Sequence, residues 1–341
     1  MDVFSPKERL DRVLCKAGVD RPPVICPGGM LNSALVDVMN QTGHTLPAGH
    51  HDAGLMADIA GDVYEMTGFE NLGLPFCMTV EAEVLGSDID YGTLECEPKI
   101  AREPYPSVSQ VGFKHIGKMA QNRRVGVVVD AVHALSKKYP DIPVIGSVTG
   151  PISTAASIVD PMQFLKELRK DPANAHRVVD YVTDHLIDYA RLLIGNGATL
   201  ITIADPTATG EILGPKMFEE YAVRYLNKLA DAVHAMGAPV IIHICGKLSS
   251  VESYMEQLHA NAVSTDALVS LEQLKNNYPA LTTMGNVSTF LLQGGESEKI
   301  VGRVQRLVAG GVDIIAPACG LSTTTPVGNI QAMTGAVKVG S

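Results

Sequence analysis

The sequence lacks several features that would assign it to a common class of protein. It has no cluster of Lys and Arg that would mark a nucleic-acid-binding surface: its densest basic spot is Arg123–Arg124, and its formal net charge is −10. No apolar stretch approaches the length of a membrane span, and no secretory signal opens the chain. We therefore expect a protein that binds neither nucleic acid nor membrane.

The cysteines are not arranged for a structural role. The chain has 6 of them at irregular spacing and no CxxC pair, which argues against a disulfide framework and a structural zinc knuckle. We expect a reducing, cytoplasmic location, where thiols are available as metal ligands. We expect three cysteines to be packed inside the protein, namely Cys15, Cys26 and Cys77. Two adjacent histidines, His50 and His51, point in different directions, and we expect both to be exposed.

Short apolar runs alternate with longer amphipathic segments. We expect strands at residues 24–27, 77–85, 143–149, 198–205, 239–245, 262–266, 281–286 and 313–319. The clearest helix covers 215–236, with Pro at its start and Gly just past its end. Eight strands that mostly alternate with helices predict an α/β fold, a (β/α)8 TIM barrel, with residues 1–341 as a single domain. An open doubly wound sheet is the strongest rival, but no GxGxxG loop follows the first strand.

Two segments fall outside the barrel pattern. The N-terminus has the pattern of an amphipathic helix, and Ser5 and Glu8 have the spacing of a capping box, so we expect a helical extension before the barrel. Residues 86–106 combine an Asp- and Gly-containing stretch with three prolines. We interpret them as an excursion after the second strand, either a hairpin or a lid at the barrel mouth.

Residues suited to metal binding gather where predicted strands end. His243 and Cys245 close one apolar run, and Cys319 closes the last one. His243 and Cys245 are two apart on a strand and share a face, so both can point to one ion that Cys319 can reach across the mouth. One imidazole and two thiolates suit zinc and leave a coordination position open, as in catalytic zinc sites. The alternative is that each residue simply packs in the core.

Carboxylates and an amide at other strand ends could bind the substrate or support the ion. The candidates are Glu81 or Glu83, Asp205, Asp266 and Asn286. A metal-bound His usually needs an acceptor for its second ring nitrogen, and a carboxylate could be that acceptor or a fourth ligand. Their alternative role is capping of the loop that follows each strand. A GxSxG nucleophile elbow is absent from the sequence.

With these motifs the chain resembles the uroporphyrinogen decarboxylase superfamily. Within it, the chain is most similar to the zinc-dependent methylcobamide:coenzyme M methyltransferases, especially those of methylamine pathways. The matching motifs extend over nearly the whole chain and include DRPPVICPGGM at 20–30, PFCMTVEAE at 75–83, GEILGP at 210–215, HICG at 243–246, MGNVS at 284–288 and PACG at 317–320.

The resemblance implies a TIM barrel in which His243, Cys245 and Cys319 bind zinc. It also implies an activity of methanogenesis: transfer of a methyl group from a methylated corrinoid (methylcobalamin) on a small partner protein to a zinc-bound thiolate, with coenzyme M as the acceptor. Residues 86–106 are our candidate for part of the docking face.

Three alternatives remain open at this stage. One is a uroporphyrinogen-decarboxylase-like lyase, although that branch uses an arginine-rich N-terminal loop and here Arg21 stands without an Arg cluster. Another is methyl transfer to a different acceptor, such as another thiol or a pterin. The third is a non-catalytic partner of a corrinoid protein.

Overall fold

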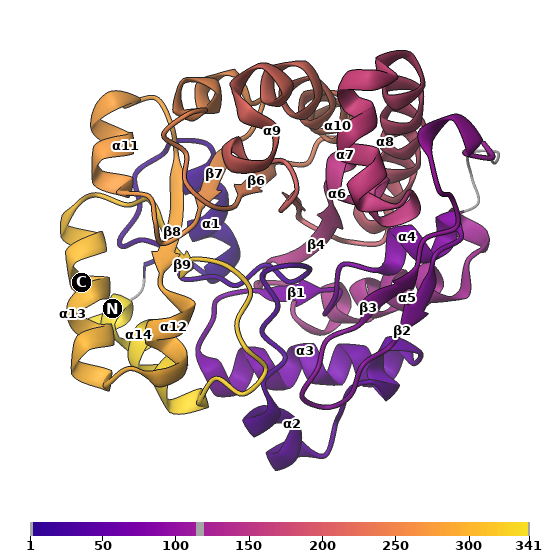
Figure 1. Ribbon diagram of the computed structural model, residues 1–341. Coiled ribbons are helices and arrows are strands. Elements are labelled where there is room, and N and C mark those ends of the chain that lie inside the picture. The colour runs from indigo at the N-terminus through magenta and orange to yellow at the C-terminus, as the bar shows by residue number, and fades with distance from the viewer. Residues whose placement is uncertain (1–2, 114–118, 340–341) are drawn as a thin grey trace.

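A seven-stranded parallel sheet forms the centre of the molecule (Figure 1). The computed structural model describes residues 3–113 and 119–339. The strands follow the order β1-β4-β5-β6-β7-β8-β9. Their bounds are Leu72–Leu74 (β1), Val144–Thr149 (β4), Leu200–Ala204 (β5), Val240–Ile244 (β6), Ala262–Thr265 (β7), Thr283–Val287 (β8) and Ile314–Pro317 (β9). Those from β4 to β9 overlap predicted strands, as expected for buried apolar runs of this length.

Helices alternate with these strands and cover the outside of the sheet (Figure 1). The α-helices are α1 (Pro6–Leu14), α2 (Val36–Thr42), α3 (Ala53–Thr67), α4 (Val80–Leu85), α5 (Arg123–Lys138), α6 (Pro151–Ile158), α7 (Pro161–Lys170), α8 (Pro172–Gly195), α9 (Gly210–Met217), α10 (Arg224–Ala235), α11 (Leu271–Asn277), α12 (Thr289–Gly294), α13 (Ser297–Ala309) and α14 (Val327–Val339). The predicted helix 215–236 is divided among α9, the π-helical turn η4 (Phe218–Val223) and α10. The chain leaves helical geometry at Gly214, where φ is 69°, a conformation that glycine adopts without a steric penalty.

The first two predicted strands differ from the structure. Residues 24–27 make only a parallel bridge, from Val24 to Ile315. Glu70 N donates to Val24 O, so this segment fills the place between β9 and β1. The predicted strand 77–85 is wrong, because β1 lies earlier and residues 80–85 form α4. Val, Ala and Val alternate with Glu there, which imitates a strand. However, Glu, Ala and Leu favour a helix, and Gly86 ends it with φ 113°.

Helix α1 closes the amino-terminal end of the barrel. Its Ser5–Glu8 capping box is formed as the spacing indicates. Leu10, Val13 and Leu14 pack against side chains at or near the starts of the strands, among them Ile145, Leu200, Ile241, Met284 and Ile314. Burial of this apolar layer leaves the carboxyl-terminal end of the strands for polar side chains, as in other barrels of this type.

The expected excursion contains an antiparallel hairpin. Its strands are β2 (Asp88–Asp90) and β3 (Lys99–Arg102), and it follows α4 rather than a second strand. Thr323 Oγ1 donates to Glu95 O at 2.6 Å, and Asn32 Nδ2 donates to a Glu97 carboxylate oxygen at 2.6 Å. The hairpin tip is therefore hydrogen-bonded to two loops: the loop of Thr323, which follows β9, and the loop of Asn32, which follows residues 24–27. Among the described residues, no helix is long and apolar enough to cross a membrane.

Candidate metal centre

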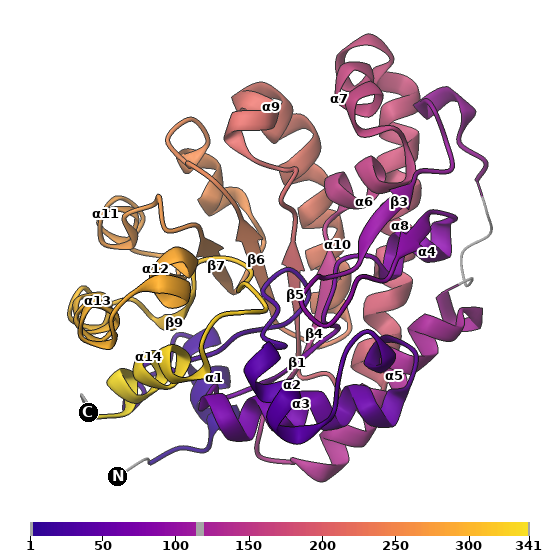
Figure 2. The same ribbon diagram turned by 60° about the horizontal axis from the view of Figure 1, so that its bottom comes forward.

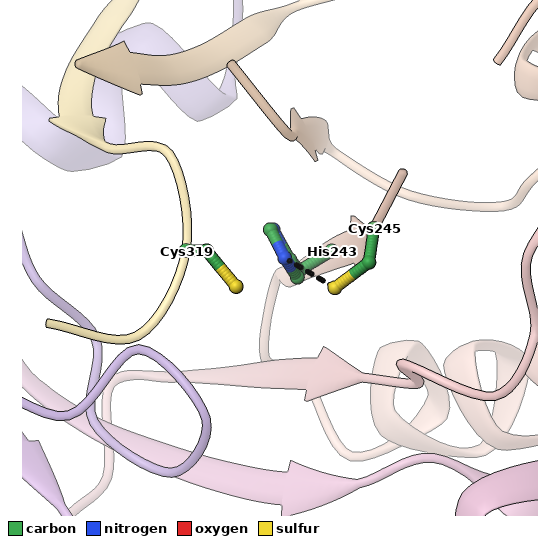
Figure 3. A group of neighbouring side chains, drawn as sticks. All are labelled: His243, Cys245 and Cys319. Atoms are coloured by element: carbon green, nitrogen blue, oxygen red, sulfur yellow. Dashed lines mark hydrogen bonds between the residues drawn. The ribbon is translucent and has the colours of Figure 1, made fainter. Parts of the chain in front are cut away.

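His243, Cys245 and Cys319 meet at the carboxyl-terminal end of the sheet (Figure 3). Their ligand atoms all lie within 4.8 Å of one another. His243 comes from β6, Cys245 directly follows that strand, and Cys319 is two residues beyond β9. His243 is fully buried, whereas both cysteines are partly exposed. The structure thus brings together the residues that the sequence analysis grouped.

The loop after Cys245 is held in place by helix α9. Gly246 has φ 71°, which allows the chain to turn sharply behind the thiol. A Cβ atom at Gly246 would meet a carboxylate oxygen of Glu211, so a larger residue would displace that side chain and strain the backbone. Lys247 N donates to that carboxylate at 3.2 Å. The first turn of α9 therefore fixes the backbone that carries Cys245.

The imidazole of His243 is held between two neighbours. Nδ1 lies 2.9 Å from Ser264 Oγ, and Nε2 lies 3.2 Å from Cys245 Sγ. We assign the tautomer in which Nδ1–H donates to Ser264, because this leaves the Nε2 lone pair directed at the sulfur atoms. The acceptor is a hydroxyl rather than the expected carboxylate. Sequence reasoning missed Ser264, which becomes visible only from the pairing of His243 with Ser264 between β6 and β7.

A second residue that sequence reasoning missed is Met30. Its Sδ lies 3.7 Å from Cys245 Sγ, so the turn after residues 24–27 forms one wall of the site. The sequence offered one signal, since Met30 ends the DRPPVICPGGM motif on which the family resemblance rests, but nothing in that motif indicates contact with Cys245.

The two thiols titrate as a pair. The pKa of Cys319 is lowered, first because the Cys245 thiol donates a hydrogen bond to its thiolate and also because His243 lies nearby. The pKa of Cys245 is raised, first by its interaction with Cys319 and then by burial. One thiolate therefore forms readily, while the second needs additional positive charge. A divalent cation at this position would supply that charge, since coordinated thiols lose their protons.

Glu81 and Asp205 are buried and serve as backbone acceptors. Glu81 accepts hydrogen bonds from Thr149 N at 2.8 Å and Thr149 Oγ1 at 3.2 Å. Asp205 accepts from Ile152 N, Ser153 N and Ser153 Oγ, at 2.6–2.8 Å, at the start of α6. Burial raises the pKa of both carboxyl groups. Their observed bonds correspond to the capping role rather than to contact with the three ligand-type residues.

Asp266 and Asn286 differ from each other in their relation to the site. The charge of Asp266 contributes to the raised pKa of Cys245, and its Oδ1 accepts from Leu268 N at 3.0 Å. Asn286 donates to the backbone oxygens of Asp266 and Val269 and accepts from Arg303, so these hydrogen bonds stabilise the loop after β7. Of these two, Asp266 is the one with an electrostatic link to the thiols.

Expectations for isolated residues had mixed outcomes. His50 is not exposed but fully buried, and burial together with the charge of Arg124 lowers its pKa to about 3. Cys15 is exposed at the end of α1 rather than packed. Cys26 and Cys77 are buried as expected. The His50 prediction treated a pair of polar residues as a loop signal, whereas the short helix before α3 turns His50 inward.

The donor set fits a tetrahedral zinc ion. Ligand distances of about 2.0–2.3 Å place the donor atoms of a tetrahedral site about 3.3–3.8 Å apart. That range is compatible with the distances found here. His243 Nε2 lies 3.2 Å from Cys245 Sγ, and all three ligand atoms lie within 4.8 Å of one another. The Ser264 contact supplies the outer hydrogen bond that a ligating histidine commonly makes.

Comparison with known proteins places the chain in a family. The model of the family "Uroporphyrinogen decarboxylase (URO-D)" matches residues 5–339. The methylcobamide:CoM methyltransferase MtbA of Methanosarcina acetivorans is 32% identical over 99% of each chain. MtaA of Methanosarcina barkeri, also a methylcobamide:CoM methyltransferase, is 30% identical over 98% of each. A solved methyltransferase from Methanosarcina mazei superposes with a TM-score of 0.92 at 30% identity, covering 98% of this chain and 99% of the other. The chain therefore belongs to the uroporphyrinogen decarboxylase (URO-D) family and is an enzyme of its methyltransferase branch.

Proposed function

We propose that this enzyme transfers a methyl group from a methylated corrinoid, carried on a separate small protein, to the thiol of coenzyme M, and that it uses zinc to do so. The observation that carries the proposal is the meeting of His243, Cys245 and Cys319 at the strand ends. The full-length similarity to methylcobamide:CoM methyltransferases supports it.

The chemistry requires a thiol to act as a nucleophile at neutral pH. A free thiol has a pKa of about 8.5 and is mostly protonated there. Bound zinc would lower the pKa of a thiol that takes the open coordination position. The substrate sulfur then forms a bond to the methyl carbon. The carbon–cobalt bond breaks with both electrons remaining on cobalt, which leaves as Co(I).

The residues of this chain would set the charge and orientation of the site. Two thiolates and a neutral imidazole balance a divalent ion, so a third thiolate makes the site anionic and keeps its sulfur nucleophilic. Ser264 holds the His243 ring so that Nε2 faces the ion. A cytoplasmic location fits this proposal, because the thiols must stay reduced.

Porphyrin decarboxylation is disfavoured by the environment of Arg21. Its guanidinium is buried and donates to both carboxylate oxygens of Glu70, at 2.8 and 2.7 Å. It is thereby committed to an internal ion pair and is not directed at a substrate carboxylate.

The test is metal content together with methyl transfer from free methylcobalamin to coenzyme M. We expect about one zinc ion per chain in protein purified without added metal. We expect both the zinc and the activity to be lost in Cys319→Ser. Cys15→Ser, at an exposed thiol, is the matched control and should keep both. Zinc retained at the parental level in Cys319→Ser would overturn the assignment of the ligands.

A further inference from the structure

An open groove of about 400 Å³ lies between helices α7 and α9. Its apolar lining includes Met162 and Leu165 of α7 and Ile212 of α9. Met162 is 64% exposed and Ile212 is 47% exposed, so both present apolar surface to a partner. Figure 2 shows α7 and α9 side by side, on the opposite side of the molecule from the two chain ends.

Unpaired positive charges surround this groove. Lys166, Arg169 and Lys170 of α7 line it, and Lys216 of α9 lines an adjoining cavity of about 510 Å³. All four side chains are exposed, and within residues 3–113 and 119–339 none of them forms an ion pair. The chain as a whole has a net charge of −10. A local cluster of cations on an acidic protein favours an acidic partner at this place.

Helix α9 connects the groove to the loop that carries Cys245. Thr209 caps the N-terminus of α9, five residues after β5 ends. In the first turn Glu211 accepts the hydrogen bond from Lys247 N, two residues beyond Cys245. Its neighbour Ile212 lines the groove. Consecutive residues of one helix thus contact the loop that carries Cys245 and the surface that would receive a partner.

We propose that the groove between α7 and α9 is the docking site for an acidic, apolar-faced segment of the protein that carries the methylated corrinoid. This inference rests on the proposed function, which needs a carrier to bring its cobalt to Cys245 and Cys319. An apolar floor with charged sides matches the usual anatomy of a transient protein interface. Further apolar side chains are exposed after other strand ends, Leu268 after β7 and Phe290 after β8.

The experiment compares two methyl donors with the zinc-loaded enzyme. One donor is free methylcobalamin, which needs no docking surface. The other is a small corrinoid-carrier protein reconstituted with methylcobalamin. The readout is the donor ratio, which is kcat/KM with the carrier divided by the rate constant with free methylcobalamin. We expect Lys166→Glu/Lys170→Glu to lower this ratio at least tenfold. Added salt should lower this ratio in the parent enzyme and have little effect in the variant, because screening weakens charge-steered association. Ile212→Ser should lower the ratio without changing its salt dependence.

Arg123→Glu/Lys137→Glu is the matched charge control, since both residues are exposed on α5, lie outside the groove and form no ion pair among the described residues. It should keep the parental ratio. An equal ratio in the parent and the groove variant would overturn the proposal, as would a parent that uses free methylcobalamin but not the carrier. A parent dimer that dissociates in the groove variant would show that a second copy of this chain fills the groove instead. Failure with free methylcobalamin itself would count against the proposed function rather than against the docking site alone.

Discussion

His243 Nδ1 lies 2.9 Å from Ser264 Oγ, in a contact that joins adjacent strands β6 and β7 behind the candidate metal centre. The hydroxyl fixes both the plane of the ring and the tautomer that leaves Nε2 free. A hydrogen bond of this kind commonly contributes a factor of about 10–100 to metal affinity.

Ser264→Ala should therefore bind zinc about 10- to 100-fold more weakly while keeping the same three ligands. Zinc affinity is measured by competition with a chromophoric chelator. Thr265→Val is the matched control, because the buried hydroxyl of Thr265 has no partner among the described residues and lies on the same strand. Parental zinc affinity in Ser264→Ala would show that the ring is held by its packing alone.

Removal of the Asp205 carboxylate should destabilise the fold more than it changes the chemistry. The carboxylate is fully buried and satisfies two backbone N–H groups and the Ser153 hydroxyl at the start of α6. Asp205→Ala leaves these donors unpaired, so we expect a loss of about 2–4 kcal/mol in the free energy of unfolding. Urea unfolding measures it. Asp130→Ala, at an exposed carboxylate on α5, should change stability little.

Much of the barrel and the grouping of three ligand-type residues follow from the sequence alone. Buried parallel strands are continuous apolar runs, so the strands containing Ile241 and Ile315 are evident, and the ligands stand where those runs end. The side chains that contact these ligand-type residues are not evident from the sequence. Ser264 faces His243 only because of the strand register, and Met30 reaches Cys245 only through a turn between distant segments. The strand predicted at residues 80–85 was wrong because their alternating pattern is compatible with both a strand and a short helix.

Arg9 should be essential for attachment of α1. Its fully buried guanidinium donates to Asp20 at 2.8 Å and to Glu70 at 2.8 Å, which ties α1 to the segments that precede residues 24–27 and β1. Arg9→Ala leaves two carboxylates without this partner, and we expect a loss of about 3–5 kcal/mol. Thermal and urea unfolding measure the loss. Asp11→Ala, exposed on the same helix, is the control, and an equal effect there would indicate a general loss of helix stability.

His50 should make the stability of the protein depend on pH. Burial first, and then the nearby charge of Arg124, lowers its pKa to about 3, against an ordinary value of 6.5. Neither ring nitrogen has a partner among the described residues that could stabilise the charged form. Between these values the unfolded chain binds a proton that the folded chain does not. The contribution of His50 is therefore fully present above pH 6.5 and is lost as the pH falls, by about 1.4 kcal/mol per pH unit.

His50→Leu should consequently lose less stability than the parent between pH 6.5 and pH 5, by about 2 kcal/mol. The measurement is urea unfolding at several pH values in the presence of a chelator, so that release of metal does not contribute. The change of stability with pH is the readout rather than stability at one pH, because substitution of a buried side chain also alters packing. His133→Leu, at an exposed ring on α5, is the control and should follow the parent. If the His50→Leu curve runs parallel to the parent curve over this interval, the His50 ring is protonated in the folded protein despite its burial.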